Sequence, residues 1–265
     1  MCEHPPVPLS VDLRIALEAA DAADAATMRR FRAPDLAVED KADRTPVSEA
    51  DRAAETAIRS HLARVVPGDA VLGEEYGASG AGGERRWIID PIDATVNYVR
   101  GVPVWATLIA LEDQEGIAAG VVSAPALGAR WWAARGMGAW AGGRPIRVSA
   151  TDRIEAAHLS INSITTHEQH GLGPQITALS RRCARTRGFG DFWSFMLLAE
   201  GAVDLVVEPV AAIWDLAPLL VIVEEAGGRF TDLAGNRTVA GGNAVASNGR
   251  LHEAVLAAMA EPVPG

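Results

Sequence analysis

The chain has 265 residues, of which 49% are hydrophobic and 22% are charged. This balance can bury a substantial core and fits a globular protein of one domain, or of two intimate subdomains. The formal net charge of −10 and the lack of a basic stripe with interleaved aromatic residues argue against nucleic-acid binding. No apolar run approaches the length of a membrane span and no secretory signal is seen, so neither membrane insertion nor export is expected.

Cysteine usage points to a reducing compartment. Cys2 and Cys183 are the two cysteines of the sequence. Two cysteines cannot supply a disulfide framework or a cysteine-rich zinc site, so a cytoplasmic protein is predicted.

The first third of the chain predicts two helices. Residues 1–8 are rich in proline and are expected to be disordered, whereas residues 9–31 form an alanine-rich amphipathic pattern whose acids we interpret as a solvated face. Ser48 is a natural N-cap for a second helix that runs to about Val65. Asp51 lies three residues beyond Ser48, so it is either the acidic partner of a capping box or part of a site.

Two pairs of acids each follow a short apolar strand. Glu74 and Glu75 come after residues 70–72, and such paired acids repel one another unless water or a cation separates them. Asp90 and Asp93 belong to WIIDPIDAT (residues 87–95), where an apolar strand is followed by a proline that is expected to end sheet pairing. Carboxylates in this place suit a hard cation such as Mg²⁺, although Asp-Pro-x-Asp is also compatible with a simple turn.

The rest of the chain predicts an antiparallel meander followed by alternating strands and helices. Residues 104–112, 116–124, 130–135 and 138–140 read as strands separated by turn signals. The clearest helix begins at Trp214-Asp215 and stops at Gly227-Gly228. We expect Asp215 to be its N-cap and Pro218 to lie in its first turn, where a missing N–H costs little.

Five acids each lie directly after a strand or before a helix, a position from which their side chains can enter one crevice: Glu74, Glu75, Asp90, Asp93 and Asp215. They occur in or beside GEE (73–75), WIIDPIDAT, WDLA (214–217) and EAGG (225–228), and an earlier acidic loop reads TPVSEAD (45–51). In these segments the chain resembles the inositol monophosphatase-like family of Mg²⁺-dependent, lithium-sensitive phosphomonoesterases. The resemblance spans approximately residues 10–260.

The resemblance implies an α/β fold, a layered αβαβα sandwich, and commonly a homodimer. Residues 1–265 would form one domain whose two subdomains divide near residues 145–155. It also implies a phosphate monoester as substrate and about two or three Mg²⁺ ions as cofactors.

The resemblance assigns roles to particular residues. It makes metal ligands of the side chains of Glu74, Asp90, Asp93 and Asp215 and of the carbonyl of Ile92, with Glu75 nearby. Catalysis would fall to Glu74, Thr95 and Asp51, and the substrate's phosphate would meet Asp93, Asp215 and the amides of Ala94 and Thr95. The family usually has glycine where this chain has Ala94, so a positive φ there would strain the turn by roughly 1 kcal/mol.

Within the family, the chain is similar to the bacterial histidinol-phosphate phosphatase branch in NYVRGVPVWAT (97–107), RGFGDFWS (187–194) and Glu208-Pro209. This similarity implies hydrolysis of L-histidinol phosphate in histidine biosynthesis. Asp191 and Glu208 are the candidates to bind its amine and imidazole. Asp191 could instead cap the helix that follows, Glu208 could simply end a strand, and Val96 stands where the branch often has lysine.

Two alternatives remain open at this point. One is a phosphatase of inositol 1-phosphate or of a broader range of sugar phosphates. The other, from a different functional class, is a catalytically weakened protein that binds metal or phosphate for regulation, which Ala94 favours and the retained acids oppose.

Overall fold

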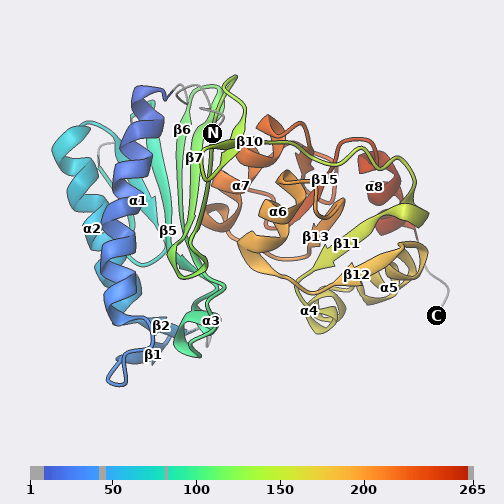
Figure 1. The fold of residues 1–265 in the computed structure, drawn as a ribbon, viewed down its shortest axis with the longest axis horizontal. Coiled ribbons are helices and arrows are strands. Elements are labelled where there is room, and N and C mark those ends of the chain that lie inside the picture. The colour runs from blue at the N-terminus through green and yellow to red at the C-terminus, as the bar shows by residue number, and fades with distance from the viewer. Residues whose placement is uncertain (1–8, 42–45, 81–82, 262–265) are drawn as a thin grey trace, which may run out of the picture.

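The structure, a computed structural model, describes residues 9–41, 46–80 and 83–261. The disorder expected for residues 1–8 lies outside these ranges. Helices and sheets alternate in five layers, αβαβα, as Figure 1 shows from the blue helices α1 and α2 to the outer helices α5 and α8. The predicted layered α/β sandwich is therefore confirmed.

The first sheet has eight strands in the order β10-β9-β8-β7-β6-β5-β3-β4. Neighbours from β5 to β10 run antiparallel, which confirms the predicted meander, while β3 lies parallel to β5. The bounds of these strands are β3 Ala70–Gly73, β4 Gly77–Ser79, β5 Arg86–Asp93, β6 Ala106–Asp113, β7 Gly116–Ala124, β8 Ala129–Ala134, β9 Ala139–Ala141 and β10 Arg144–Ile146.

Helices α1 (Val11–Arg30) and α2 (Glu49–Val65) cover the outer face of this sheet. A short antiparallel pair, β1 (Val38–Asp40) and β2 (Pro46–Ser48), joins them. The five-residue helix α3 (Thr95–Val99) follows β5 directly.

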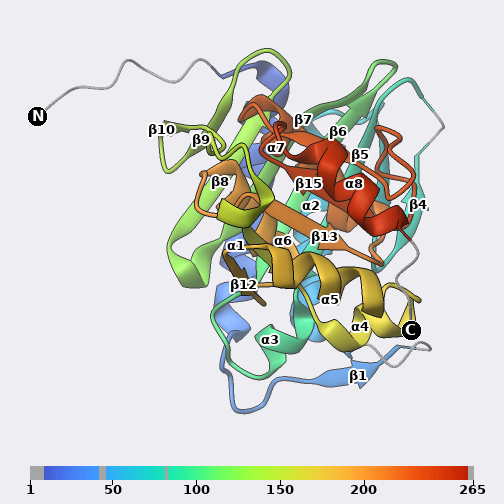
Figure 2. The same ribbon diagram turned by 90° about the vertical axis from the view of Figure 1, so that its right-hand side faces the viewer.

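The second sheet has five strands in the order β12-β11-β13-β15-β14. Figure 2 looks onto the helices that cover its outer face. The bounds of the elements in this half are β11 His158–Ile161, α4 Ile164–Gln169, α5 Gly173–Arg182, β12 Arg185–Arg187, α6 Asp191–Ala199, β13 Leu205–Glu208, α7 Ile213–Glu225, β14 Arg229–Thr231, β15 Ala244–Ser247 and α8 His252–Ala260.

Helices α6 and α7 form the middle layer, and their apolar side chains share one core with both sheets. On β5, Ile88 belongs to this middle core, whereas Trp87 and Ile89 pack with α1 and α2 on the other face. Successive side chains of a strand point to opposite faces, so a strand buried on both faces reads as a continuous apolar run.

The chain passes from the first sheet to the second through residues 147–157. The core between the sheets draws on both halves, from Ile88 of β5 to Leu216 of α7. The division into two subdomains near residues 145–155 stays a prediction.

Acids on α1 form ion pairs with arginines of the first half of the chain. Arg85 binds Asp12 with Nη2 2.6 Å from Oδ1, and Arg130 lies 2.7 Å from carboxylate oxygens of both Asp21 and Asp24. Burial raises the pKa of Asp24, whose side chain is 18% exposed. The interpretation of these acids as a solvated face was wrong for Asp24, because its ion pair fastens α1 to the sheet.

The start of α7 differs from the prediction. The helix begins at Ile213, so Asp215 is its third residue rather than its N-cap, and its Oδ2 accepts the N–H of Ala212 at 2.8 Å. Pro218 is the sixth residue and lies inside the helix, where its missing N–H leaves the carbonyl of Trp214 without its usual partner.

Gly120 of β7 allows α7 to lie close to the sheet. A Cβ atom at Gly120 would lie 2.7 Å from Cγ1 of Val221 and 2.9 Å from Cα of Pro218. Real Cβ atoms do not approach backbone this closely, so the sheet and the helix would have to separate.

Gly120→Ala is expected to lower the free energy of unfolding by about 1–3 kcal/mol, the usual cost of an extra group in a packed core. Urea denaturation followed by circular dichroism measures this loss. Gly68→Ala is the matched control, because a Cβ at Gly68 meets nothing within 4 Å. Equal unfolding midpoints for the two variants would contradict the close packing.

Candidate active site

The end of β5 that carries Asp90 and Asp93 has an irregularity in its pairing. Pairing with β6 shifts between Asp90 and Asp93, and the strand continues through Pro91 instead of ending there as expected. A proline is tolerated at such a bulge because one residue there needs no ladder partner. Asp90 Oδ1 accepts the N–H of Ile92 at 3.0 Å within the strand, so the segment presents carboxylates from an irregular strand end rather than from a simple turn.

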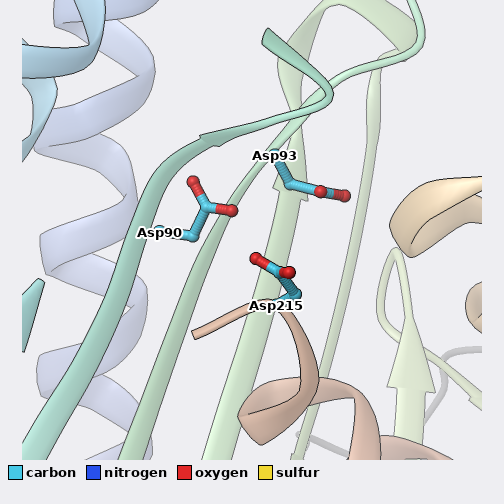
Figure 3. Close-up of side chains that lie close together, drawn as sticks. All are labelled: Asp90, Asp93 and Asp215. Atoms are coloured by element: carbon cyan, nitrogen blue, oxygen red, sulfur yellow. The ribbon is translucent and has the colours of Figure 1, made fainter. Parts of the chain in front are cut away.

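Three carboxylates converge beside this bulge. Asp90, Asp93 and Asp215 each place an oxygen within 4.8 Å of the others, two from β5 and one from α7 (Figure 3). Burial and neighbouring carboxylates raise the pKa values of Asp90 and Asp93 well above the ordinary value, and burial raises the pKa of Asp215 to about 6. Buried acids that repel one another are stabilised by a cation, and an all-oxygen set of ligands fits Mg²⁺.

A cleft of about 640 Å³ opens over the three carboxylates. It brings together residues from the ends of strands and the starts of helices on both halves of the chain. Its lining residues are Pro46, Glu74, Asp90, Ile92, Asp93, Ala94, Thr95, Val96, Asn97, Asn162, Asp191, Val210, Ala211, Ala212, Trp214 and Asp215.

The carboxylates of Glu74 and Glu75 both form an ion pair with the ammonium group of Lys41. Lys41 Nζ lies 2.7 Å from Oε1 of Glu74 and 2.6 Å from Oε1 of Glu75. Burial alone would lower the pKa of Lys41, but its hydrogen bonds to both carboxylates raise it. Lys41 was not predicted as a residue of the site, since a partner 33 residues away leaves no local pattern.

Asp51 is both a helix cap and a neighbour of the cleft. Its Oδ2 accepts the N–H of Ser48 at 2.8 Å, which confirms the capping box, and its Oδ1 lies 3.2 Å from Thr95 Oγ1. Thr95 Oγ1 also lies 2.8 Å from the carbonyl oxygen of Ile92. Burial raises the pKa of Asp51, which is fully covered and is linked to the cleft through Thr95.

Ala94 adopts the backbone that the family usually gives to glycine. Its φ of 64° and ψ of 48° lie in the left-handed region, directly before α3. Because Ala94 has a positive φ, its backbone is strained, and this costs roughly 1 kcal/mol for a residue with a Cβ.

Asp191 is not the N-cap of α6. The helix follows Gly190, and the N–H of Phe192 is donated to Oδ2 of Asp93 at 2.8 Å. Asp191 has a φ of 46° and its carboxylate lines the cleft, 3.4 Å from Nδ2 of Asn162. Burial raises the pKa of Asp191, and the capping alternative for this residue is wrong.

Glu208 lies at the end of β13 beside an inner cavity of about 60 Å³. Asp191, Asn162 and Val210 line both this cavity and the cleft, so the two spaces adjoin. Glu208 is 6% exposed, and its Oε1 has no hydrogen-bond partner among the described residues. Burial, with help from Asp191 and Asp215, raises its pKa to about 8.

The layered α/β fold and this acidic cleft define a protein of the class that binds a divalent cation through carboxylates. Comparison with known families gives the same class. A model of the inositol monophosphatase family matches residues 9–263. The chain belongs to the inositol monophosphatase family.

Relatives within the family point further. The chain is 54% identical over 254 residues to a histidinol-phosphatase of Streptomyces coelicolor, covering 92% of this chain and 95% of the relative. It is 52% identical over 250 residues to a histidinol-phosphatase of Mycobacterium tuberculosis, covering 92% and 96%. The crystal structure of the extragenic suppressor protein SuhB from Bartonella henselae superposes with a TM-score of 0.89 at 30% identity, covering 96% of this chain and 100% of that one.

Asp90→Asn and Asp215→Asn are each expected to reduce Mg²⁺-dependent phosphate release by more than about a hundredfold, since even the loss of a group that merely supports a ligand costs 10–100-fold. The metal-free variants should unfold at the same temperature as the parent or higher, because the raised pKa values mean that ionised Asp90 and Asp215 destabilise the empty site at neutral pH. Phosphate release and thermal unfolding in a chelator measure the two effects.

Asp21→Asn serves as the control for these variants, because the side chain of Asp21 is 67% exposed and does not line the cleft. Turnover near that of the parent at low Mg²⁺ in a folded Asp90 or Asp215 variant would reject that residue as an essential ligand.

Ala94→Gly is expected to raise kcat/KM more than it alters thermal stability. Glycine relieves the left-handed strain but also loses more conformational entropy on folding, so the two terms partly cancel in stability. Steady-state kinetics beside thermal unfolding separate the effects. An unchanged or lower kcat/KM would mean that the turn is already adapted to alanine.

Proposed function

We propose that the protein is a Mg²⁺-dependent phosphomonoesterase that hydrolyses L-histidinol phosphate to L-histidinol and phosphate in histidine biosynthesis. The observation that carries the phosphatase assignment is the triad in a cleft formed by the buried Asp90 and the half-buried Asp93 and Asp215. The histidinol-phosphatase relatives at 54% and 52% identity support the choice of substrate.

The metal would be held by Glu74, Asp90, Asp93, Asp215 and the carbonyl of Ile92, with Glu75 beside them. Converging buried carboxylates with raised pKa values fit such an ion, and we propose about two or three Mg²⁺. Bound Mg²⁺ would neutralise the phosphate and acidify the attacking water.

The chain's own groups would orient the reactants. The single hydroxyl hydrogen of Thr95 can be donated to only one of its two acceptors at a time, so an oxygen lone pair remains to accept from the attacking water. Asp51 keeps this hydroxyl in place, and the Glu74 carboxylate can take the proton from that water. The amides of Ala94 and Thr95, at the start of α3, can bind the phosphate oxygens, and no phosphoenzyme is needed.

Substrate choice would depend on the leaving alcohol, since every phosphomonoester presents the same phosphate. Among the described residues no group donates a hydrogen bond to the buried Oε1 of Glu208, and an ammonium group of the substrate would supply a donor. Asp191 lies at the junction of the cleft and the inner cavity, where it can bind the second nitrogen-bearing group. Val210 and Ala211 supply apolar contact between them.

Two other functions keep specific support. Solved inositol monophosphatases with the same fold, such as that of Thermotoga maritima at 31% identity and a TM-score of 0.85, favour an inositol-phosphate or sugar-phosphate substrate. The left-handed Ala94 favours a weakened, regulatory protein. The complete carboxylate set favours an active enzyme over the latter.

The remaining assignments rest on the family resemblance and on composition. We propose a homodimer in the cytoplasm, which light scattering and cell fractionation would test. Within the ranges that the structure describes, no helix combines the length and the apolar character needed to cross a bilayer.

L-histidinol phosphate is expected to be hydrolysed with a kcat/KM about 10–100-fold higher than that of inositol 1-phosphate. A charge-assisted hydrogen bond to Glu208 or Asp191 contributes about 1.5–3 kcal/mol, and each 1.36 kcal/mol is tenfold in rate. Phosphate release from both substrates measures the ratio. Equal efficiencies would remove the histidinol assignment and leave the phosphatase mechanism intact.

Glu208→Gln should shrink this preference while sparing the hydrolysis of uncharged sugar phosphates. Glu253→Gln is the matched control, because Glu253 is an exposed partner of Arg229. A preference that survives in the Glu208 variant would assign recognition of the amine to another group.

A further inference from the structure

Glu55 is a buried carboxylate on α2 that neither lines the cleft nor belongs to the predicted site. Its side chain is fully covered. Oε2 accepts the N–H of Glu75 at 2.8 Å, and Oε1 accepts the N–H of Tyr76 at 3.3 Å and Nε of Arg59 at 2.7 Å. A helix side chain therefore binds the backbone of the turn between β3 and β4.

Hydrogen bonds from β5 and α2 fix the backbone of the turn between β3 and β4. The N–H of Glu74 is donated to the carbonyl of Ile89 on β5 at 3.1 Å, and Glu55 takes the next two N–H groups. Arg59 completes the attachment with Nη2 2.5 Å from the carbonyl oxygen of Gly77. With its amides fixed in this way, the turn directs the side chain of Glu74 into the cleft.

Gly73 makes room for the carboxylate. A Cβ at Gly73 would lie 2.0 Å from Oε1, 2.4 Å from Cδ and 2.7 Å from Oε2 of Glu55. The φ of Gly73 is not positive, so the requirement for glycine here is the space that Glu55 occupies rather than the backbone conformation.

We propose that Glu55 is a positioning residue that sets where the carboxylates of Glu74 and Glu75 stand for metal binding. The inference rests on the proposed role of Glu74 as a ligand. A buried charge near two other acids is costly unless hydrogen bonds compensate it. Here the compensation comes from Arg59 and from the amides of the turn, so the same hydrogen bonds that stabilise the buried carboxylate also fix the turn.

Two variants disturb the contact between Glu55 and the turn, one by changing the chemistry of the side chain and the other by filling the space that it occupies. Glu55→Gln keeps the shape but presents an NH₂ group to an N–H donor. Gly73→Ala keeps the charge of Glu55 but pushes its carboxylate away from the turn. Leu62→Ala is the control, because it removes core packing from the same helix without touching the turn.

Calorimetric titration with Mg²⁺ alone, without substrate, is the primary measurement. The Mg²⁺ concentration for half-maximal phosphate release is measured alongside kcat at saturating Mg²⁺. Glu55→Gln and Gly73→Ala are expected to weaken Mg²⁺ binding by about tenfold or more, the usual effect of losing a group that orients a ligand, with a smaller change in kcat. Leu62→Ala should lower the unfolding temperature and leave Mg²⁺ affinity unchanged.

Parent-like Mg²⁺ binding by both folded variants would overturn the positioning role alone. An equal loss in Leu62→Ala would also overturn it, by tracing the effect to general destabilisation. If Glu55→Gln does not fold, Gly73→Ala decides the question, since it retains the buried ion pair. Failure of the parent protein to bind Mg²⁺ would instead overturn the proposed function and this inference with it.

Discussion

Repulsion between buried carboxylates is the constraint around which the molecule is arranged. Among the described residues, each acid of the triad accepts one backbone N–H: Asp90 accepts that of Ile92, Asp93 that of Phe192 and Asp215 that of Ala212. The backbone therefore orients the three carboxylates, and their mutual repulsion favours the binding of a cation.

The packing of the five layers brings the carboxylates of the site together. Helix α7 lies between the two sheets, so its first turn meets the bulged end of β5 from the opposite side. Gly120 allows the helix to pack closely, and α2 supports the turn of Glu74 from the outer layer. Ligands from distant parts of the sequence thus come to rigid strand ends and helix starts, which hold them more precisely than loops do.

Much of this organisation could be predicted from the sequence, because apolar periodicity and turn residues are local signals. The meander, the helix after Ser48 and the grouping of Asp90, Asp93 and Asp215 all follow from such signals or from the family resemblance. The six-residue helix α4 was not predicted, since so short a segment carries little periodicity. Likewise, no local rule showed that Asp93, rather than Asp191, would bind the first turn of α6.

The contacts that escaped prediction are the long-range polar ones. Lys41 meets Glu74 and Glu75, and Glu55 meets the turn that carries them, only after α2 has packed on the first sheet. Sequence spacing cannot encode such pairs, because they depend on tertiary packing. Several of the groups that tune the site were therefore visible only in the folded protein.

The hydrogen bond from Phe192 to Asp93 joins the two halves of the cleft energetically. Asp93 is a proposed metal ligand, and Phe192 is the second residue of α6, the helix that begins at Asp191. A cation that reoriented Asp93 would therefore act on the start of α6, and a substrate cation bound by Asp191 would act back on Asp93. Linkage would make this relation reciprocal, because each ligand then changes the other's affinity by the same factor, and metal binding and selectivity for the leaving group would be one coupled equilibrium.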